Sequence, residues 1–238
     1  MSTETTPTIV LVHGAFADSS SWNGVVANLR AQGYSVIAAA NPLRGLASDA
    51  AYIGAVLDSI EGPVVLVGHS YGGSVITVAA TTKANVTALV YIAAFIPAEG
   101  ESALGLTDRF PGSTLGPTTS PAQYPLADLS SGTELYIRQE DFPTQFAADV
   151  PLAIADLMAT TQRPVALTAL QEPASTAAWR NIPAFALLTT EDRNIPIETQ
   201  RFMAERASAH TVEVAASHAV SVSTPGAVSE LISLAATK

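Results

Sequence analysis

The fold is decided by residues 63–73, whose sequence is PVVLVGHSYGG. The first half is an apolar, largely β-branched run, which is typical of a strand buried on both faces of a parallel sheet. The second half is a G-x-S-x-G motif that leads into a helical pattern through Val75, Ile76 and Ala79. In a strand–turn–helix setting, such a motif places its serine on a sharp, strained turn. We therefore predict that Ser70 is an exposed nucleophile at the carboxyl end of the sheet, where open α/β sheets hold their sites.

Strand-like and helical patterns alternate on both sides of this motif. Six strands are predicted, at residues 8–12, 34–38, 63–67, 87–92, 184–188 and 211–215. Helical patterns lie between them, one with Ser48 as its expected N-cap, one ending near Gly33, one over residues 197–207 and one beginning at Pro225. Because parallel strands need crossover helices, the sequence predicts an α/β fold with a doubly wound, mostly parallel six-stranded sheet.

Residues 98–182 interrupt this alternation. Ten of the fifteen prolines lie between Pro97 and Pro183, and no long apolar strand occurs there. Because proline at this density argues against a sheet interior, we predict a small inserted cap rather than sheet, with helices near residues 152–161 and 174–179. Residues 1–97 and 183–238 then form the core. The aromatic side chains of the cap predict a mostly apolar roof over the pocket: Phe110, Tyr124, Tyr136, Phe142, Phe146 and Trp179.

Composition excludes several classes of protein and site. The chain has 238 residues and no cysteine, which excludes disulfides, thiolate metal sites and a cysteine nucleophile. A net charge of −10 with eleven scattered Lys and Arg provides no basic stripe for nucleic acid or for an anionic membrane surface. The sequence also lacks ligand-like His pairs, phosphate loops and dinucleotide fingerprints, so no metal and no cofactor are predicted. The expected partner is a small-molecule substrate, with either a monomer or a homodimer compatible.

The sequence also gives an expectation for localisation. The first seven residues have neither a basic nor an apolar signal-peptide region. No apolar run approaches the roughly 18 residues of a spanning helix. We therefore expect a soluble, cytoplasmic protein.

A serine nucleophile needs a base, and four histidines compete for that role. His218 follows the last predicted strand, so it lies at the same sheet edge as Ser70 and is our candidate. We expect His13 to hold the turn after the first strand, His69 to point away from Ser70, and His210 to be a solvated surface residue.

The base in turn needs an orienting carboxylate. Glu191 and Asp192 follow the fifth strand, and we choose Asp192 because its shorter side chain holds an imidazole more rigidly. A helix N-cap is its alternative role, and Glu99 is the second candidate for the acid. The chain order Ser70, Asp192, His218 is that of α/β-hydrolases and differs from the other serine triads.

An oxyanion hole completes the predicted site. The backbone amide of Tyr71 lies at the start of a helix, where free donors favour negative charge. The second donor should come from the loop after the first strand, with Ala15 as the candidate and Phe16 as the alternative.

These motifs together carry a resemblance to a known family. The chain resembles an α/β-hydrolase throughout, and its core is similar to the branch of plant methylesterases and hydroxynitrile lyases with their bacterial esterase relatives. The carrying segments are LVHGA (11–15), Trp22, VGHSYGG (67–73), AAFIP (93–97), DRNIP (192–196) and Ser217–His218. The resemblance implies a Ser70–His218–Asp192 triad, an oxyanion hole from the Ala15 and Tyr71 amides, and a small cap.

One departure from the family pattern narrows the expected chemistry. In the hydroxynitrile lyases of the branch that this chain resembles, Glu precedes the nucleophile and Lys follows the histidine. This chain has His69 and Ala219 at those positions, so the electrostatics that handle cyanide are not expected here. We expect a serine hydrolase that cleaves a small carboxylic ester or lactone through an acyl-enzyme on Ser70. Two alternatives stay open: a cofactor-free lyase, perhydrolase or C–C hydrolase on the same triad, and a small-ligand receptor of this fold.

Overall fold

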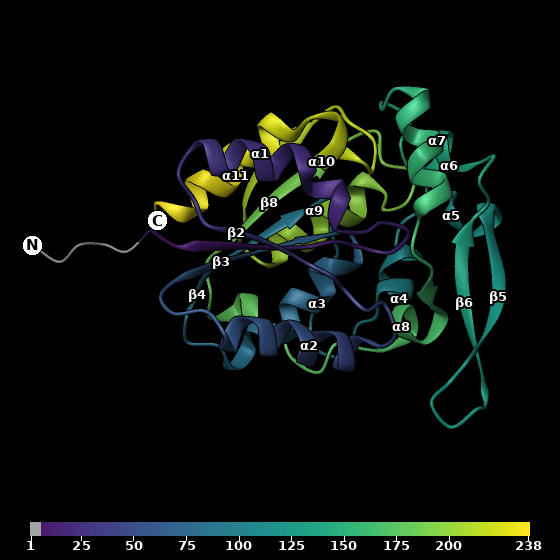
Figure 1. Cartoon of the computed structure of the whole chain (residues 1–238), viewed down its shortest axis with the longest axis horizontal. Helices are drawn as coiled ribbons and strands as arrows, with labels where there is room; N and C mark the ends of the chain where they lie inside the picture. The colour runs from purple at the N-terminus through teal and green to yellow at the C-terminus, as the bar shows by residue number, and fades with distance from the viewer. Residues whose placement is uncertain (1–5) are drawn as a thin grey trace, which may run out of the picture.

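A six-stranded parallel sheet forms the centre of the computed structural model, which describes residues 6–238 (Figure 1). The expectation that the chain has no signal peptide concerns residues 1–7, and residues 1–5 lie outside the described part of the chain. The strand order is β2-β1-β3-β4-β8-β9, and every neighbouring pair is parallel. The strands are β1 (Thr8–Val12), β2 (Val36–Ala39), β3 (Val64–His69), β4 (Val86–Ile92), β8 (Ala184–Thr189) and β9 (His210–Val214). The predicted doubly wound α/β fold is confirmed.

Helices cover both faces of this sheet (Figure 1). One face carries α1 (Asn23–Ala31), α10 (Val220–Ser223) and α11 (Pro225–Ala236), and the other carries α2 (Leu46–Asp58), α3 (Tyr71–Ala79) and α9 (Ile197–Arg206). Side chains alternate between the two faces along each strand: Ile9 packs in the first layer and Val10 in the second. Because the four inner strands β1, β3, β4 and β8 are covered by both layers, they are largely apolar without alternation, whereas the edge strand β9 is exposed.

Most predicted boundaries agree with the structure within two residues, with one exception at α2. This helix begins at Leu46 and is preceded by Gly45, so the expected N-cap role of Ser48 is wrong. The Ser48 hydroxyl instead donates to the Gly45 carbonyl within the first turn (3.0 Å). Leu46, the first residue of the helix, is buried against the core. Short 3₁₀ helices η1 (Ser19–Trp22) and η2 (Ala80–Thr82) lie before α1 and after α3.

The segment between β4 and β8 gathers at one end of the sheet (Figure 1). It contains α4 (Ala103–Thr107), α5 (Leu115–Thr118), β5 (Thr119–Pro125), β6 (Ser131–Ile137), α6 (Phe142–Gln145), α7 (Leu152–Thr161), β7 (Val165–Ala166), α8 (Leu167–Gln171) and η3 (Ala178–Arg180). The helix predicted at residues 152–161 is present, whereas the one predicted at 174–179 is reduced to η3.

The expectation that this segment contains no sheet is wrong. Strands β5, β6 and β7 form a three-stranded antiparallel sheet. Strand β5 lies at its edge, where Pro121 and Pro125 remove no interior ladder bond. Because β5 is buried on neither face, it needs no continuous apolar run, and its sequence therefore does not indicate a strand.

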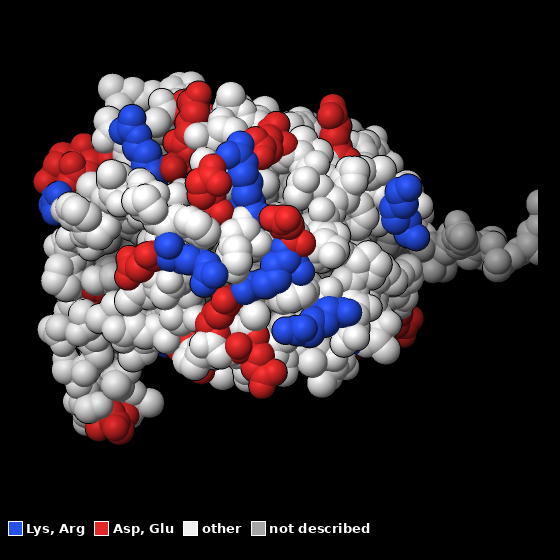
Figure 2. Space-filling model, turned by 180° about the vertical axis from the view of Figure 1, so that it is seen from behind, with Lys and Arg blue, Asp and Glu red and all other residues white. Residues whose placement is uncertain are grey.

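Charged side chains of both signs lie side by side on the face seen in Figure 2. Arg201 pairs with Glu198 and Glu213 at 2.7 Å, and Arg206 pairs with Glu101 at the same distance. Among residues 6–238, no helix combines the length and the apolar character of a membrane span.

Candidate active site

Ser70 occupies the sharp turn between β3 and α3. It is 6% exposed, so the expectation of an exposed nucleophile is wrong: the residue lines an internal cavity because the segment between β4 and β8 covers this end of the sheet. Its backbone has φ 54° and ψ −124°, a left-handed conformation that is uncommon for residues other than glycine. Its carbonyl accepts hydrogen bonds from the amides of Gly73 (2.9 Å) and Phe95 (3.1 Å), which hold the turn. A Cβ at position 68 would lie 2.6 Å from the Gly72 carbonyl oxygen, so this turn requires Gly68.

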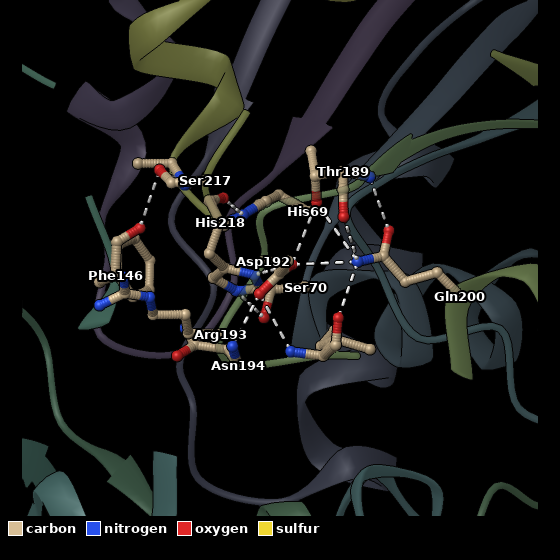
Figure 3. A network of polar contacts seen from close by, with 12 residues as sticks. His69, Ser70, Phe146, Thr189, Asp192, Arg193, Asn194, Gln200, Ser217 and His218 are labelled. Carbon is tan, nitrogen blue, oxygen red and sulfur yellow. Dashed lines mark hydrogen bonds and ion pairs between the residues drawn. The ribbon is translucent and has the colours of Figure 1, made fainter. Parts of the chain in front are cut away.

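Ser70, His218 and Asp192 form a continuous line of hydrogen bonds (Figure 3). The Ser70 Oγ lies 2.8 Å from Nε2 of His218, and Nδ1 of His218 lies 2.7 Å from Oδ2 of Asp192. Because a carboxylate only accepts, the proton sits on Nδ1, which leaves Nε2 free to accept the serine proton. Three residues from the ends of three strands are thereby joined at the carboxyl edge of the sheet.

The Asp192 carboxylate is held by four further donors. Its Oδ1 accepts from the backbone amides of Asn194 (2.7 Å) and Ile195 (3.0 Å). Its Oδ2 accepts from the Thr189 hydroxyl and from the Gln200 side-chain amide, both at 3.1 Å (Figure 3). These bonds fix the orientation of the carboxylate and offset the cost of burying it.

The loop that carries His218 is tied to the segment between β4 and β8. The Ser217 hydroxyl donates a very short hydrogen bond to the Asp149 carboxylate, and the Ser217 amide donates to the same group at 3.1 Å. The Phe146 ring packs edge-on against the His218 imidazole, with centroids 4.9 Å apart. Asp149 and Phe146 therefore support the histidine from outside the core.

The other three histidines make no hydrogen bond to Ser70. Nε2 of His69 donates to the His218 carbonyl (2.9 Å), and burial lowers the pKa of His69 well below its usual value. His13 donates from Nδ1 to the Gly14 carbonyl (2.9 Å), and burial lowers its pKa to about 4. His210 is exposed at the start of β9. Only His218 is placed to exchange a proton with Ser70.

The two carboxylates that compete with Asp192 for the role of the acid, Glu191 and Glu99, are exposed. Among the described residues, neither side chain makes a hydrogen bond to His218.

Two backbone amides near Ser70 are free. Within residues 6–238, the amides of Ala15 and Tyr71 have no hydrogen-bond partner, and both residues line the cavity that contains Ser70. The Phe16 amide is occupied, since it donates to the Arg163 carbonyl (3.1 Å).

The cavity next to Ser70 has a volume of about 250 Å³ and a largely apolar lining, to which the core contributes the aromatic residues Phe16, Tyr71 and Phe95. The segment between β4 and β8 contributes Ala103, Leu104, Thr107, Asp108, Ser113, Leu115, Gly116, Pro117, Thr119, Leu135 and Leu170. None of the six cap aromatics expected to roof the pocket lines it, so that expectation is wrong; two of them, Phe142 and Phe146, stack on each other beside His218 instead. Asp108 is the one carboxylate in the lining, and it is exposed.

Neither the second cavity nor any cluster of ionisable side chains forms another candidate site in the described part of the chain. A second cavity of about 360 Å³ lies beside α7, but Ser70 does not line it. Across residues 6–238, no three His, Asp or Glu side chains gather as metal ligands would.

Comparison with known proteins places this chain in a family. A family model described as "Alpha/beta hydrolase family" matches residues 9–231. The chain belongs to the α/β-hydrolase family. A "Carbendazim hydrolyzing esterase" of Nocardioides sp. (strain SG-4G) is 36% identical to it over 113 residues, 42% of this α/β-hydrolase and 47% of that protein. The match thus spans about half the length of the relative.

Solved structures share the fold of this α/β-hydrolase over nearly its whole length. Polyneuridine aldehyde esterase has a TM-score of 0.83 at 19% identity, covering 96% of this chain and 98% of that one. A pyrethroid hydrolase from Sphingobium faniae JZ-2 has a TM-score of 0.78 at 23% identity, with 98% of both chains covered. A methylesterase from Arabidopsis has a TM-score of 0.80 at 18% identity, covering 97% and 99%. Plant methylesterases and bacterial hydrolases are thus both fold neighbours, and the predicted family resemblance is confirmed.

Several supporting residues of this α/β-hydrolase could not be found from its sequence. Thr189, Gln200 and Asp149 belong to no motif. Thr189 ends β8 three residues before Asp192, Gln200 lies in α9 eight residues after it, and Asp149 lies 68 residues before Ser217. The one local signal was for Asn194, which lies two residues after the chosen acid in the DRNIP segment.

Proposed function

We propose that this α/β-hydrolase cleaves small carboxylic esters or lactones through an acyl-enzyme on Ser70. The observation that carries the proposal is the buried hydrogen-bonded line from Ser70 through His218 to Asp192, next to a cavity with two unpaired backbone amides. The names of its relatives, a carbendazim-hydrolysing esterase among them, support ester hydrolysis as the reaction class.

The proposed reaction runs in two halves. As the Ser70 Oγ attacks the ester carbonyl carbon, Nε2 of His218 takes the hydroxyl proton, and the carbonyl electrons move onto oxygen. The amides of Ala15 and Tyr71 donate to that oxyanion. The intermediate collapses by breaking the bond to the alcohol oxygen, which receives the proton from His218. Water then attacks the acyl-enzyme with His218 again as base, and the carboxylic acid leaves as Ser70 regains its proton.

Asp192 would act through His218 rather than on the substrate. Its carboxylate keeps the proton on Nδ1 and stabilises the imidazolium that forms in each half-reaction. The four donors around the carboxylate keep it in position while the charge on the imidazole changes.

The cavity favours compact, neutral substrates. Its largely apolar lining provides few partners for a charged group, and Asp108 together with the net charge of −10 repels anions. We propose residues 98–182 as the cap that closes this cavity over a core of residues 1–97 and 183–238, since both parts contribute lining residues.

The proposal is tested with nitrophenyl esters, methyl esters and lactones, using the wild type and Ser70→Ala. We expect turnover by the wild type and only residual turnover by the variant, because loss of the nucleophile costs on the order of 10⁶ in kcat. A fluorophosphonate should add one covalent mass to the peptide that contains Ser70. If the folded wild type turned over none of these compounds, a receptor of this fold would be favoured; labelling at another residue would reject Ser70.

A further inference from the structure

Asn194 lies in the wall of the cavity that contains Ser70, and its backbone is fixed. The residue is 3% exposed and lines the cavity. Its amide donates to Oδ1 of Asp192 (2.7 Å), and its carbonyl accepts from the Ser113 hydroxyl (2.9 Å). Hydrogen bonds at both its N–H and its C=O therefore fix the backbone of Asn194 relative to Ser70, His218 and Asp192.

The side-chain amide of Asn194 has a defined orientation, because Gln145 sets it. Nε2 of Gln145 donates to the Arg193 carbonyl (3.0 Å) and to Oδ1 of Asn194 (2.7 Å), while its Oε1 accepts from the Thr114 hydroxyl (2.8 Å). A backbone carbonyl cannot donate, so the nitrogen of Gln145 must face Arg193. The Asn194 atom next to that nitrogen is therefore the oxygen, and its Nδ2 lies on the other branch.

Nδ2 of Asn194 has no hydrogen-bond partner among the described residues. This nitrogen is not sealed inside the protein, and because Asn194 lines the cavity, Nδ2 is open to it. The hydroxyls of Thr107, Ser113 and Thr119, which line the same cavity, each donate to a backbone carbonyl. The Tyr71 hydroxyl is likewise taken up by Asp49 (2.9 Å). Within the described lining, Asn194 therefore offers the unused side-chain N–H donor.

We propose that Asn194 is a specificity-determining residue that donates a hydrogen bond to an acceptor atom in the acyl or alcohol part of the substrate. The preferred class is a neutral ester with an ether, carbonyl or heteroaromatic acceptor in an otherwise apolar chain. An alkyl ester of the same shape leaves the buried Nδ2 unpaired, which costs the enzyme the desolvation of that donor. This inference rests on the ester hydrolysis proposed above.

The test uses two pairs of esters that differ by one oxygen in place of a methylene group. The acyl pair is 4-nitrophenyl methoxyacetate and 4-nitrophenyl butyrate, and the alcohol pair is 2-methoxyethyl acetate and butyl acetate. For each pair the ratio of kcat/KM, ether over alkyl, is measured in the wild type and in Asn194→Leu. Intrinsic differences in reactivity cancel when the two ratios are compared. We expect at least one ratio to be roughly tenfold higher in the wild type, as an unsatisfied buried donor predicts.

Two further variants separate the donor from general packing. Asn194→Asp keeps an oxygen that can accept from Gln145 and replaces the cavity-facing N–H donor with a carboxylate oxygen that only accepts, so it should lower the same ratio even if the leucine variant folds poorly. Because this substitution also adds a negative charge, which both esters of a pair meet, the ratio and not the absolute rate is the readout. Thr107→Val is the matched control: it alters the same cavity wall, but its hydroxyl already binds the Ala103 carbonyl (2.9 Å), so the ratio should not move.

The outcomes distinguish this inference from the function on which it rests. Equal ratios in the wild type, Asn194→Leu and Asn194→Asp, with Ser70 still labelled by a fluorophosphonate, overturn the role of Asn194 alone. An equal change in Thr107→Val also overturns it, since cavity shape would then be the cause. No turnover of any of the four esters and no labelling overturn both proposals together.

Discussion

At the scale of single residues, the site depends on one strained turn and one buried carboxylate. Ser70 holds a left-handed backbone at φ 54°, a conformation that costs roughly 1–3 kcal/mol outside glycine and persists where the surroundings enforce it. Two hydrogen bonds to its carbonyl supply that enforcement. Asp192 is held by four donors besides His218, so neither its position nor its rotamer is free.

Asp192→Asn should lower kcat by about 10⁴, because the amide cannot hold the imidazole with its proton on Nδ1. KM should change far less, since Asp192 does not line the cavity. The measurement is steady-state kinetics on the best ester of the panel. Glu191→Gln and Glu99→Gln serve as controls because both carboxylates are exposed. A normal rate in Asp192→Asn together with a loss in Glu99→Gln would move the acid to Glu99.

At the scale of elements, the loop between α6 and α7 holds the loop that carries His218. Asp149 accepts from both the hydroxyl and the amide of Ser217, and the Ser217 hydroxyl in turn accepts from the Ala219 amide (3.2 Å). Position 218 is thus bracketed by bonds that originate in a segment nearly 70 residues earlier (a separation of 68). The segment that covers the cavity and the loop that carries the proposed base are mechanically coupled.

Asp149→Asn should therefore reduce kcat while leaving KM nearly unchanged. Charge-assisted hydrogen bonds contribute about 1.5–3 kcal/mol each when both partners are held, so we expect a loss of roughly tenfold. The split between kcat and KM is the deciding readout, because a change in cavity shape would move KM. Asp156→Asn is the matched control on the neighbouring α7, where the side chain is exposed. An equal effect of the two substitutions would show that charge alone, and not the bond to Ser217, is responsible.

At the scale of the whole molecule, burial of neutral histidines links stability to pH. Burial lowers the pKa of His13 to about 4, and it lowers that of His69 as well. Between the unfolded value of 6.5 and about 4, the unfolded chain binds protons that the folded chain does not. The contribution of the neutral, buried histidines to the free energy of unfolding is therefore complete above pH 6.5 and is lost as the pH falls toward 4.

The free energy of unfolding should thus decrease from pH 7.5 to pH 5, with His13 alone contributing up to about 2 kcal/mol over that interval. Urea unfolding at several pH values measures this slope. His13→Asn should flatten it, whereas His210→Asn should not, because His210 is exposed. If the free energy of unfolding had the same pH dependence in the wild type and in His13→Asn, His13 would not be its source.

The sequence alone determined the core of this protein because its signals are local. Strands buried on both faces are continuous apolar runs, and a G-x-S-x-G turn between a strand and a helix has one geometry, so the parallel sheet and the position of Ser70 follow from neighbouring residues. His218 and Asp192 could be chosen because the carboxyl ends of parallel strands meet at one edge of the sheet.

Only the tertiary structure decided what surrounds those residues. Strand β5 is buried on neither face and β6 is buried only at Glu134 and Ile137, so neither strand carries a continuous apolar run that would mark it. The orientation of Asn194 depends on Gln145, 49 positions away, and the support of Ser217 depends on Asp149. None of the six expected cap aromatics lines the cavity, and two of them, Phe142 and Phe146, stack beside His218 instead. Contacts of this kind arise from how distant segments pack together, and the spacing of residues along the chain does not encode them.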